Sequence, residues 1–174
     1  MKVIFLDFDG VMNSERNLER LQHQEKDTED EFGTVFDPGC VDNLRELIDR
    51  TGAKVVLITS WKRYGEEAMR RLWEGRNMPG EMIGITPNDV PGPAVECDEN
   101  GMLPEGFNLF SLSSKGREIE VWMEREGVLD AYVILDDWPD FTEEQAPHYI
   151  RTDAYVGLTE KDVKRAEAIL TFDI

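Results

Sequence analysis

Two aspartates that could do chemistry stand near the start of the chain, Asp7 and Asp9, and Gly10 follows them. Asp7 ends an apolar run at residues 2–7, a pattern typical of a strand that is buried on both faces. A carboxylate at the end of such a strand is costly unless a cation meets it. Glycine in the following turn lets the backbone approach a ligand closely. The DxDG pattern therefore indicates a cation site, although calcium loops and ordinary turns also contain it.

A hydroxyl pair and a lysine form the next candidates. Thr59 and Ser60 follow the apolar run 54–59, and Lys115 stands at the start of an expected helix. Strand-end hydroxyls often only satisfy local backbone groups. A lysine at a helix N-terminus is mildly disfavoured by the macrodipole, and a solvated surface lysine is the ordinary alternative. Neither feature is specific alone.

A second acid pair, Asp136-Asp137, follows the apolar run 131–135. Adjacent acids at a buried strand end favour a metal ion, because a divalent cation offsets their charge. Acid pair, hydroxyl, lysine and acid pair each fall where a different element should reach one edge of a sheet. That coincidence makes a shared site the favoured interpretation.

The elements that must position these residues alternate along the chain. Asp37-Pro38 predicts a helix start and Gly52 its end, and Thr159 with Asp162 predicts a capped final helix. Short strands alternating with helices favour a parallel sheet that has helices on both faces, with ligands beyond the carboxyl ends of the strands. Strands are expected at 2–7, 54–59, 81–85, 131–135 and 148–152, and helices from Asp37 to Gly52, over 64–75, from Ser113 or Ser114, and from Thr159.

Two segments interrupt this alternation. Residues 13–36 are polar and highly charged, and we expect a loop or a loose helical excursion. Residues 86–105 are rich in Pro, Gly, Asn and Asp, and we expect a loop with a small hairpin. The whole chain, 1–174, is expected to form one domain with short insertions near 13–36 and 86–113.

Composition restricts the class of protein. The chain has 174 residues, of which 40% are hydrophobic and 32% charged, as in an ordinary globular domain. No apolar stretch is long enough for a membrane helix, and the N-terminal residues do not resemble a signal peptide, so a cytoplasmic location is expected. A net charge of −18 argues against stable binding to duplex nucleic acid or to anionic membranes. Cys40, Cys97, His23 and His148 form no zinc or disulfide pattern.

The ordered set Asp7-Phe8-Asp9-Gly10-Val11, Thr59-Ser60, Lys115 and Asp136-Asp137 resembles the four motifs of the haloacid dehalogenase (HAD) superfamily. The resemblance implies a Rossmann-like three-layer α/β sandwich with a mostly parallel central sheet and a minimal cap. The segments 11–13, Ser60-Trp61 and 156–159 are similar to a compact branch that includes phosphatase-like domains of RNA repair proteins. That branch often has Ser-Trp-Arg where this chain has Ser60-Trp61-Lys62, so the resemblance supports the chemistry more strongly than the substrate.

The resemblance implies a phosphatase that works through an aspartyl-phosphate. Asp7 would be the nucleophile, and Asp9 the general acid and then the general base, kept protonated on approach by the surrounding negative charge. Thr59, with Ser60 as the alternative, would hydrogen-bond a phosphoryl oxygen. Lys115 would neutralise both Asp7 and the transferring group.

Mg²⁺ is the expected cofactor, since the ligands are hard oxygens. Asp7, the backbone carbonyl of Asp9 and Asp136 would bind it. Asp137 would bind it directly or orient one of its water ligands.

The insertions leave little room for a large cap, so we expect an open site. Open sites suit phosphate groups on larger molecules, such as nucleic-acid termini or phosphoproteins, as well as nucleotides or small molecules covered by a partner. Trp61 could stack on a base there, although an aromatic residue beside a buried strand is more often part of the core.

Two other classes remain as alternatives. A signalling receiver domain also combines acids, a threonine and a lysine, but its acids normally occur in the reverse order and it needs no Asp9. A catalytically silent phosphate-binding module would keep the same residues without turnover.

Overall fold

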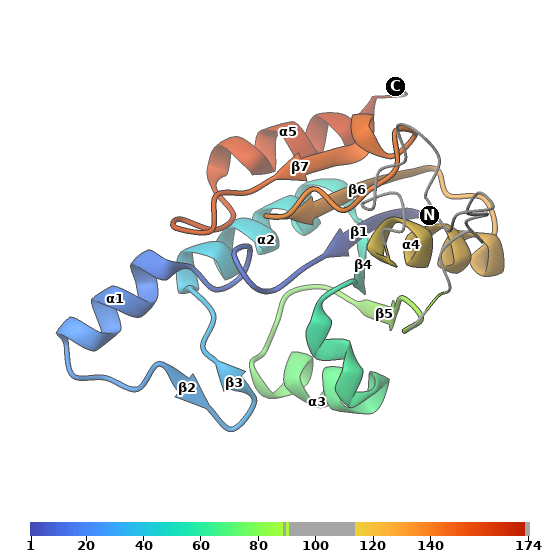
Figure 1. The fold of residues 1–174 in the computed structure, drawn as a ribbon. Helices are drawn as coiled ribbons and strands as arrows, with labels where there is room; N and C mark the ends of the chain where they lie inside the picture. The colour runs from blue at the N-terminus through green and yellow to red at the C-terminus, as the bar shows by residue number, and fades with distance from the viewer. Residues whose placement is uncertain (89, 91–113, 173–174) are drawn as a thin grey trace, which may run out of the picture.

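The computed structural model describes residues 1–88, 90 and 114–172. Its centre is a five-stranded sheet in the order β5-β4-β1-β6-β7, in which every neighbouring pair is parallel. Figure 1 shows these strands between the helices. The strands are β1 (Lys2–Leu6), β4 (Lys54–Leu57), β5 (Met82–Ile85), β6 (Ala131–Asp136) and β7 (Tyr149–Arg151).

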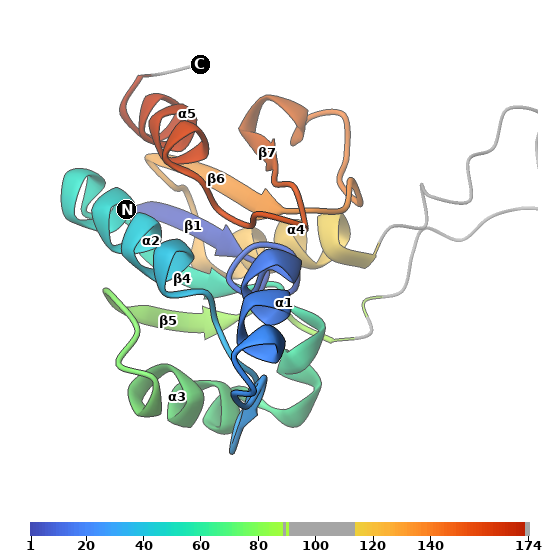
Figure 2. The ribbon, with the colours of Figure 1, turned by 90° about the vertical axis from the view of Figure 1, so that its left-hand side faces the viewer.

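Helices cover both faces of this sheet, which confirms the three-layer α/β prediction (Figures 1 and 2). Buried residues of α2, α3 and α5 pack with Ile4 and Leu6 on one face. Ile119 and Trp122 of α4 pack with Val3 and Phe5 on the other. The helices are α1 (Glu15–His23), α2 (Pro38–Thr51), α3 (Glu66–Gly75), α4 (Ser114–Glu126) and α5 (Glu160–Thr171), with short 3₁₀ helices η1 (Ser60–Tyr64) and η3 (Ala146–His148).

The predicted helix boundaries are largely confirmed, because they rest on local capping chemistry. The Asp37 side chain accepts a hydrogen bond from the Gly39 N–H at the start of α2, and Gly52 ends that helix with φ at 66°. Thr159 and Asp162 form the predicted capping box of α5. Ser114 begins α4, whereas Ser113, the other predicted start, lies outside the described residues.

The polar segment 13–36 is more structured than a loop. Ser14 caps the nine-residue helix α1, and an antiparallel hairpin follows, β2 (Glu29–Asp30) with β3 (Gly33–Thr34). Arg76 at the end of α3 holds this hairpin through an ion pair with Asp30, with N–O at 2.6 Å. Of the two expected forms, the helical excursion is therefore the one found. The predicted insertion at 86–113, with its small hairpin, lies almost wholly outside the described residues.

Within the described part of the chain, no helix combines the length and the apolarity needed to cross a membrane.

Candidate active site

Three neighbouring strands bring the predicted residues together at the carboxyl end of the sheet. Asp7 follows β1, Asp136 ends β6, and Thr59 follows β4, the strand on the other side of β1. The Asp7 N–H donates to the Leu135 carbonyl at 3.0 Å, which continues the β1–β6 pairing to the nucleophile candidate. Because the carboxyl ends of parallel strands lie side by side, residues that are far apart in sequence meet there.

Asp7, Asp136 and Asp137 form a carboxylate cluster in which one oxygen from each lies within 4.8 Å of the others. Asp136 is fully buried and Asp7 nearly so. Gly10 leaves room for the Asp137 carboxylate in this cluster, because a Cβ at position 10 would lie 2.6 Å from Oδ2 of Asp137. Its φ of 71° is also a conformation that favours glycine.

Lys115, in the first turn of α4, reaches into the same cluster. Its Nζ donates to Oδ2 of Asp136 at 2.6 Å and to Oδ2 of Asp7 at 3.0 Å. Burial would lower the pKa of Lys115, but the attraction of the two carboxylates outweighs it and raises that pKa to about 12. The ammonium is therefore charged at every relevant pH.

The Lys115 ammonium balances only one of the three carboxylates in the cluster, so two negative charges remain uncompensated. Burial, and then repulsion from Asp7, raise the pKa of Asp136 to about 7 against the opposing attraction of Lys115. The same two causes raise the pKa of Asp137. Hard oxygen ligands with two uncompensated charges fit a divalent cation such as Mg²⁺.

Asp9 has an exposed side chain held by two donors, and it is not among the three clustered carboxylates. Asn13 Nδ2 donates to one carboxyl oxygen at 2.8 Å, and Trp61 Nε1 donates to the other at 2.9 Å. Asn13 also accepts a hydrogen bond from the Gly10 N–H at 3.1 Å. Asn13 and Trp61 therefore position the predicted acid–base residue. A metal contact of the Asp9 backbone carbonyl remains a prediction.

Thr59 is fully buried, whereas Ser60 is exposed. Oγ1 of Thr59 accepts a hydrogen bond from the Trp61 N–H at 3.3 Å and so caps η1. Among the hydrogen bonds of the described residues, this hydroxyl acts only as an acceptor, which leaves its proton to donate. Thr59 thus has the expected local structural role, and its predicted contact with a phosphoryl oxygen remains a prediction.

The ring of Trp61 belongs mainly to the core, as the packing interpretation predicted. It lies edge-on to Phe8 with ring centroids 5.5 Å apart and tilted against Phe36 at 6.2 Å. Its N–H nevertheless points to Asp9. One residue therefore links the core to the acid–base candidate.

Sequence reasoning missed a buried ion pair, Lys62–Glu118, that joins η1 to α4 next to the candidate site. Lys62 Nζ lies 2.5 Å from Oε2 of Glu118 and 3.0 Å from the Pro87 carbonyl oxygen. Thr86 Oγ1 lies 3.3 Å from the same Glu118 oxygen. Glu118 stands three residues after Lys115, on neighbouring positions of α4, so the pair ties η1 to the helix that carries Lys115. The lysine directly after Ser60-Trp61 was the available signal, but its partner is 56 residues away.

The comparisons with known proteins agree with this geometry. The domain family described as the HAD domain in Swiss Army Knife RNA repair proteins matches residues 3–163, nearly the whole chain. The chain belongs to this HAD family. No curated protein and no solved structure gave a match.

Membership in the family confirms the resemblance seen in the motifs and the α/β Rossmann-like fold. It identifies a HAD-type phosphatase or hydrolase domain in general terms, of a family that usually uses Mg²⁺. The family match and the buried acids support a metal site at Asp7, Asp136 and Asp137.

Proposed function

We propose that this HAD domain is a magnesium-dependent phosphomonoester hydrolase that forms an aspartyl-phosphate on Asp7. One observation supports the proposal above the others. Lys115 contacts the carboxylates of both Asp7 and Asp136, Asp137 lies in the same cluster, and Asp9 follows two residues after Asp7. A buried nucleophile beside a fixed cation and a divalent-metal site is the arrangement that phosphoryl transfer needs.

The carboxylates of Asp7, Asp136 and Asp137, with the Asp9 carbonyl, would hold Mg²⁺. When bound, the ion would neutralise charge on the phosphoryl oxygens and align the phosphate with Asp7. Lys115 would contribute a permanent positive charge to the same group.

In the first step, a carboxylate oxygen of Asp7 forms a bond to phosphorus while the bond to the leaving oxygen breaks. Asp9 in its acid form donates a proton to that oxygen. In the second step, a water molecule attacks the phosphorus, Asp9 accepts its proton, and inorganic phosphate leaves with Asp7 restored. The hydrogen bonds from Asn13 and Trp61 would hold Asp9 in reach of both the leaving oxygen and the water.

We propose phosphorylated nucleic-acid ends or nucleotides as substrates. The family description concerns RNA repair proteins, and the first insertion consists of α1 and a short hairpin, which is small for a cap. Strong net negative charge opposes stable duplex binding but allows a brief encounter with one strand end. A cytoplasmic location is part of the same proposal.

Hydrolysis of p-nitrophenyl phosphate with and without Mg²⁺ tests the chemistry. We expect activity that disappears with chelator and in Asp7→Asn, while Asp9→Asn stops turnover and lets phospho-enzyme accumulate. Asp49→Asn, at an exposed acid of α2, is the matched control and should keep wild-type rates. Wild-type activity in Asp7→Asn would refute the mechanism. Metal and phosphate binding without any turnover would instead indicate the silent binding module.

A panel of 3′- and 5′-phosphorylated oligonucleotides and phosphorylated metabolites tests the substrate class. We expect the highest kcat/KM among the nucleic-acid ends or nucleotides. A clear preference for a metabolite that carries no base would refute the substrate proposal and leave the chemistry intact.

A further inference from the structure

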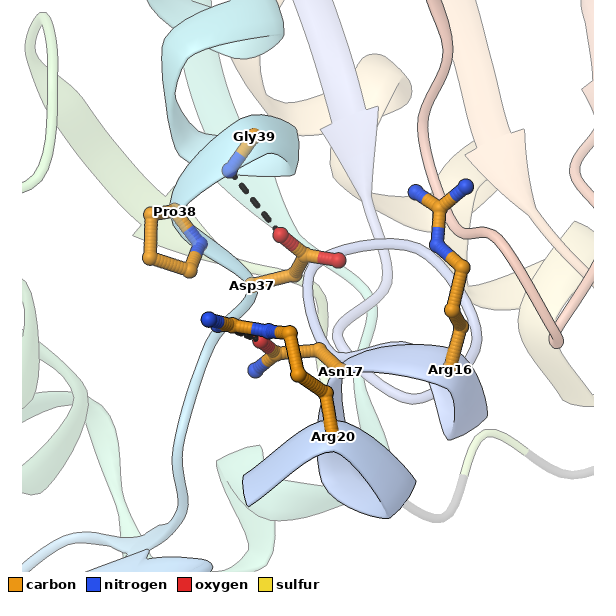
Figure 3. Close-up of a pocket in the computed structure, with 6 residues that line it drawn as sticks. All are labelled: Arg16, Asn17, Arg20, Asp37, Pro38 and Gly39. Atoms are coloured by element: carbon orange, nitrogen blue, oxygen red, sulfur yellow. Dashed lines mark hydrogen bonds between the residues drawn. The ribbon is translucent and has the colours of Figure 1, made fainter. Parts of the chain in front are cut away.

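A cavity lies between the start of α1 and the N-terminus of α2. It has a volume of about 430 Å³, within the range of small-ligand sites. Figure 3 shows its lining side chains, with the guanidinium of Arg20 beside the Asn17 amide and that of Arg16 apart from it. The lining residues are Arg16, Asn17, Arg20, Asp37, Pro38 and Gly39.

The cavity is cationic in a strongly acidic chain. Two arginines against one aspartate leave 2 − 1 = +1, whereas the whole chain carries −18. Among the ion pairs of the described residues, none involves Arg16 or Arg20. Arg20 Nη2 donates at 2.6 Å to Oδ1 of Asn17, a neutral acceptor. The chain has 37 acidic residues and 19 lysines and arginines, so two guanidinium groups that line one cavity outside any ion pair of the described residues indicate an anionic ligand.

A buried amide holds the Arg20 guanidinium at the wall of the cavity. Asn17 is 3% exposed, and within the described structure its Nδ2 has no hydrogen-bond acceptor. Because Arg20 binds Oδ1 of this amide, the orientation that leaves Nδ2 unpaired is fixed. Buried amide donors normally find a partner, and Figure 3 shows this amide next to the Arg20 guanidinium.

Asp37 and the N-terminus of α2 complete the cavity. One Asp37 oxygen accepts from the Gly39 N–H at 2.9 Å, and the other from the Ser14 hydroxyl at 2.6 Å. These bonds occupy both oxygens, and the positive end of the α2 dipole offsets part of their charge. The carboxylate still repels an anion, so the two arginines must supply the net attraction.

The cavity shares a loop with the candidate active site. Asn13 donates to Asp9, and the next residue, Ser14, donates to Asp37. The Asp37 N–H also donates to the Met12 carbonyl at 2.8 Å. The segment 12–14 therefore holds both the acid–base residue Asp9 and the cavity residue Asp37.

We infer that this cavity binds a second phosphate group of the substrate, the one that is not hydrolysed, such as the phosphodiester next along a nucleotide strand. The inference rests on the proposed function and extends it, because it assigns substrate length and charge to Arg16 and Arg20. Guanidinium groups bind phosphate through paired N–H donors.

Steady-state kinetics on Arg16→Gln/Arg20→Gln tests the inference with p-nitrophenyl phosphate, which carries one phosphate, and with terminally phosphorylated di- and trinucleotides. We expect KM for the oligonucleotides to rise about tenfold or more with little change in kcat, and no change for p-nitrophenyl phosphate. A tenfold change corresponds to about 1.4 kcal/mol of binding free energy. Arg16→Lys/Arg20→Lys should lie in between, since it keeps the charge but loses the paired donors.

Arg45→Gln/Arg125→Gln removes the same charge from exposed positions of α2 and α4 and should behave as wild type. An unchanged KM for every oligonucleotide in the Arg16/Arg20 variant would overturn the inference. Loss of inorganic phosphate binding in that variant by titration calorimetry, with oligonucleotide KM unchanged, would assign the cavity to free phosphate and also overturn it.

Direct binding separates this inference from the proposed function. If the wild type turned over no substrate, the proposed function would fail. The Kd of a phosphorylated trinucleotide would still decide the cavity: a tenfold weakening in Arg16→Gln/Arg20→Gln would support it, and an equal Kd would overturn it.

Discussion

Replacing Lys62 by methionine should destabilise the protein more than any exposed charge substitution. The Lys62 and Glu118 side chains are 5% and 8% exposed, with N–O at 2.5 Å. Methionine fills a similar volume but leaves the Glu118 carboxylate buried without its cation. Breaking a buried pair in this way costs about 3–5 kcal/mol, a large part of the roughly 5–15 kcal/mol that stabilises a domain.

Urea unfolding followed by tryptophan fluorescence measures the effect. With a slope of about 2 kcal/mol/M, the midpoint should fall by about 1.5–2.5 M. Lys54→Met is the matched control, because Lys54 and Glu81 have the same N–O distance of 2.5 Å but are 40% and 65% exposed. That change should cost about 0–1 kcal/mol.

A double variant, Lys62→Met/Glu118→Met, should recover much of the loss, because no buried charge remains unpaired. Equal costs for Lys62→Met and Lys54→Met would refute the reasoning that burial, and not distance, decides the strength of the pair.

Other predictions concern the carboxylate cluster and its neighbours. The raised pKa of Asp136, about 7 against an ordinary 3.8, means that ionising this residue costs stability as pH rises from about 4 to 7. In the presence of chelator, the free energy of unfolding of Asp136→Asn minus that of the wild type should therefore increase over that pH window and stay constant above it. Urea titrations that give the same value of this quantity at pH 5 and pH 8 would contradict the prediction. Saturating Mg²⁺, at about 100 times its Kd, should stabilise the wild type by about 2.7 kcal/mol and Asp136→Asn by much less, as thermal unfolding will show. Gly10→Ala should weaken Mg²⁺ binding by displacing Asp137, and unchanged affinity in calorimetry would exclude that close approach. Trp61→Phe should keep the aromatic packing but remove the N–H donor to Asp9. We therefore expect kcat to fall more for alkyl phosphates, whose leaving oxygen needs a proton, than for p-nitrophenyl phosphate. An equal fall for both substrates would point to a general structural defect.

Local chemistry explains which parts of the fold could be predicted. The α2 and α5 boundaries followed from Asp37, Gly52 and the Thr159–Asp162 capping box, all of which act within a few residues. The short apolar runs predict the strands, and a parallel sheet brings Asp7 and Asp136 together at the carboxyl ends of β1 and β6.

Long-range partners explain what could not be predicted. Nothing near Lys62 in the sequence indicates that Glu118, 56 residues later, buries its charge. The hairpin after α1 depends on Arg76, 46 residues from its partner Asp30. The cavity at Arg16 and Arg20 depends on two helices meeting, and the sequence shows only charged residues in a polar segment.

Trapping the phospho-enzyme tests the central claim most directly. Asp9→Asn would be mixed in Mg²⁺ with p-nitrophenyl phosphate, whose leaving oxygen needs no proton, and quenched in acid. The modified residue would be mapped by peptide mass spectrometry, with borohydride reduction to mark an acyl-phosphate as homoserine. We expect phosphate on Asp7, dependent on Mg²⁺ and absent from Asp7→Asn/Asp9→Asn. Phosphate on another residue, or Mg²⁺-dependent hydrolysis that persists in Asp7→Asn without any modified Asp7, would contradict it.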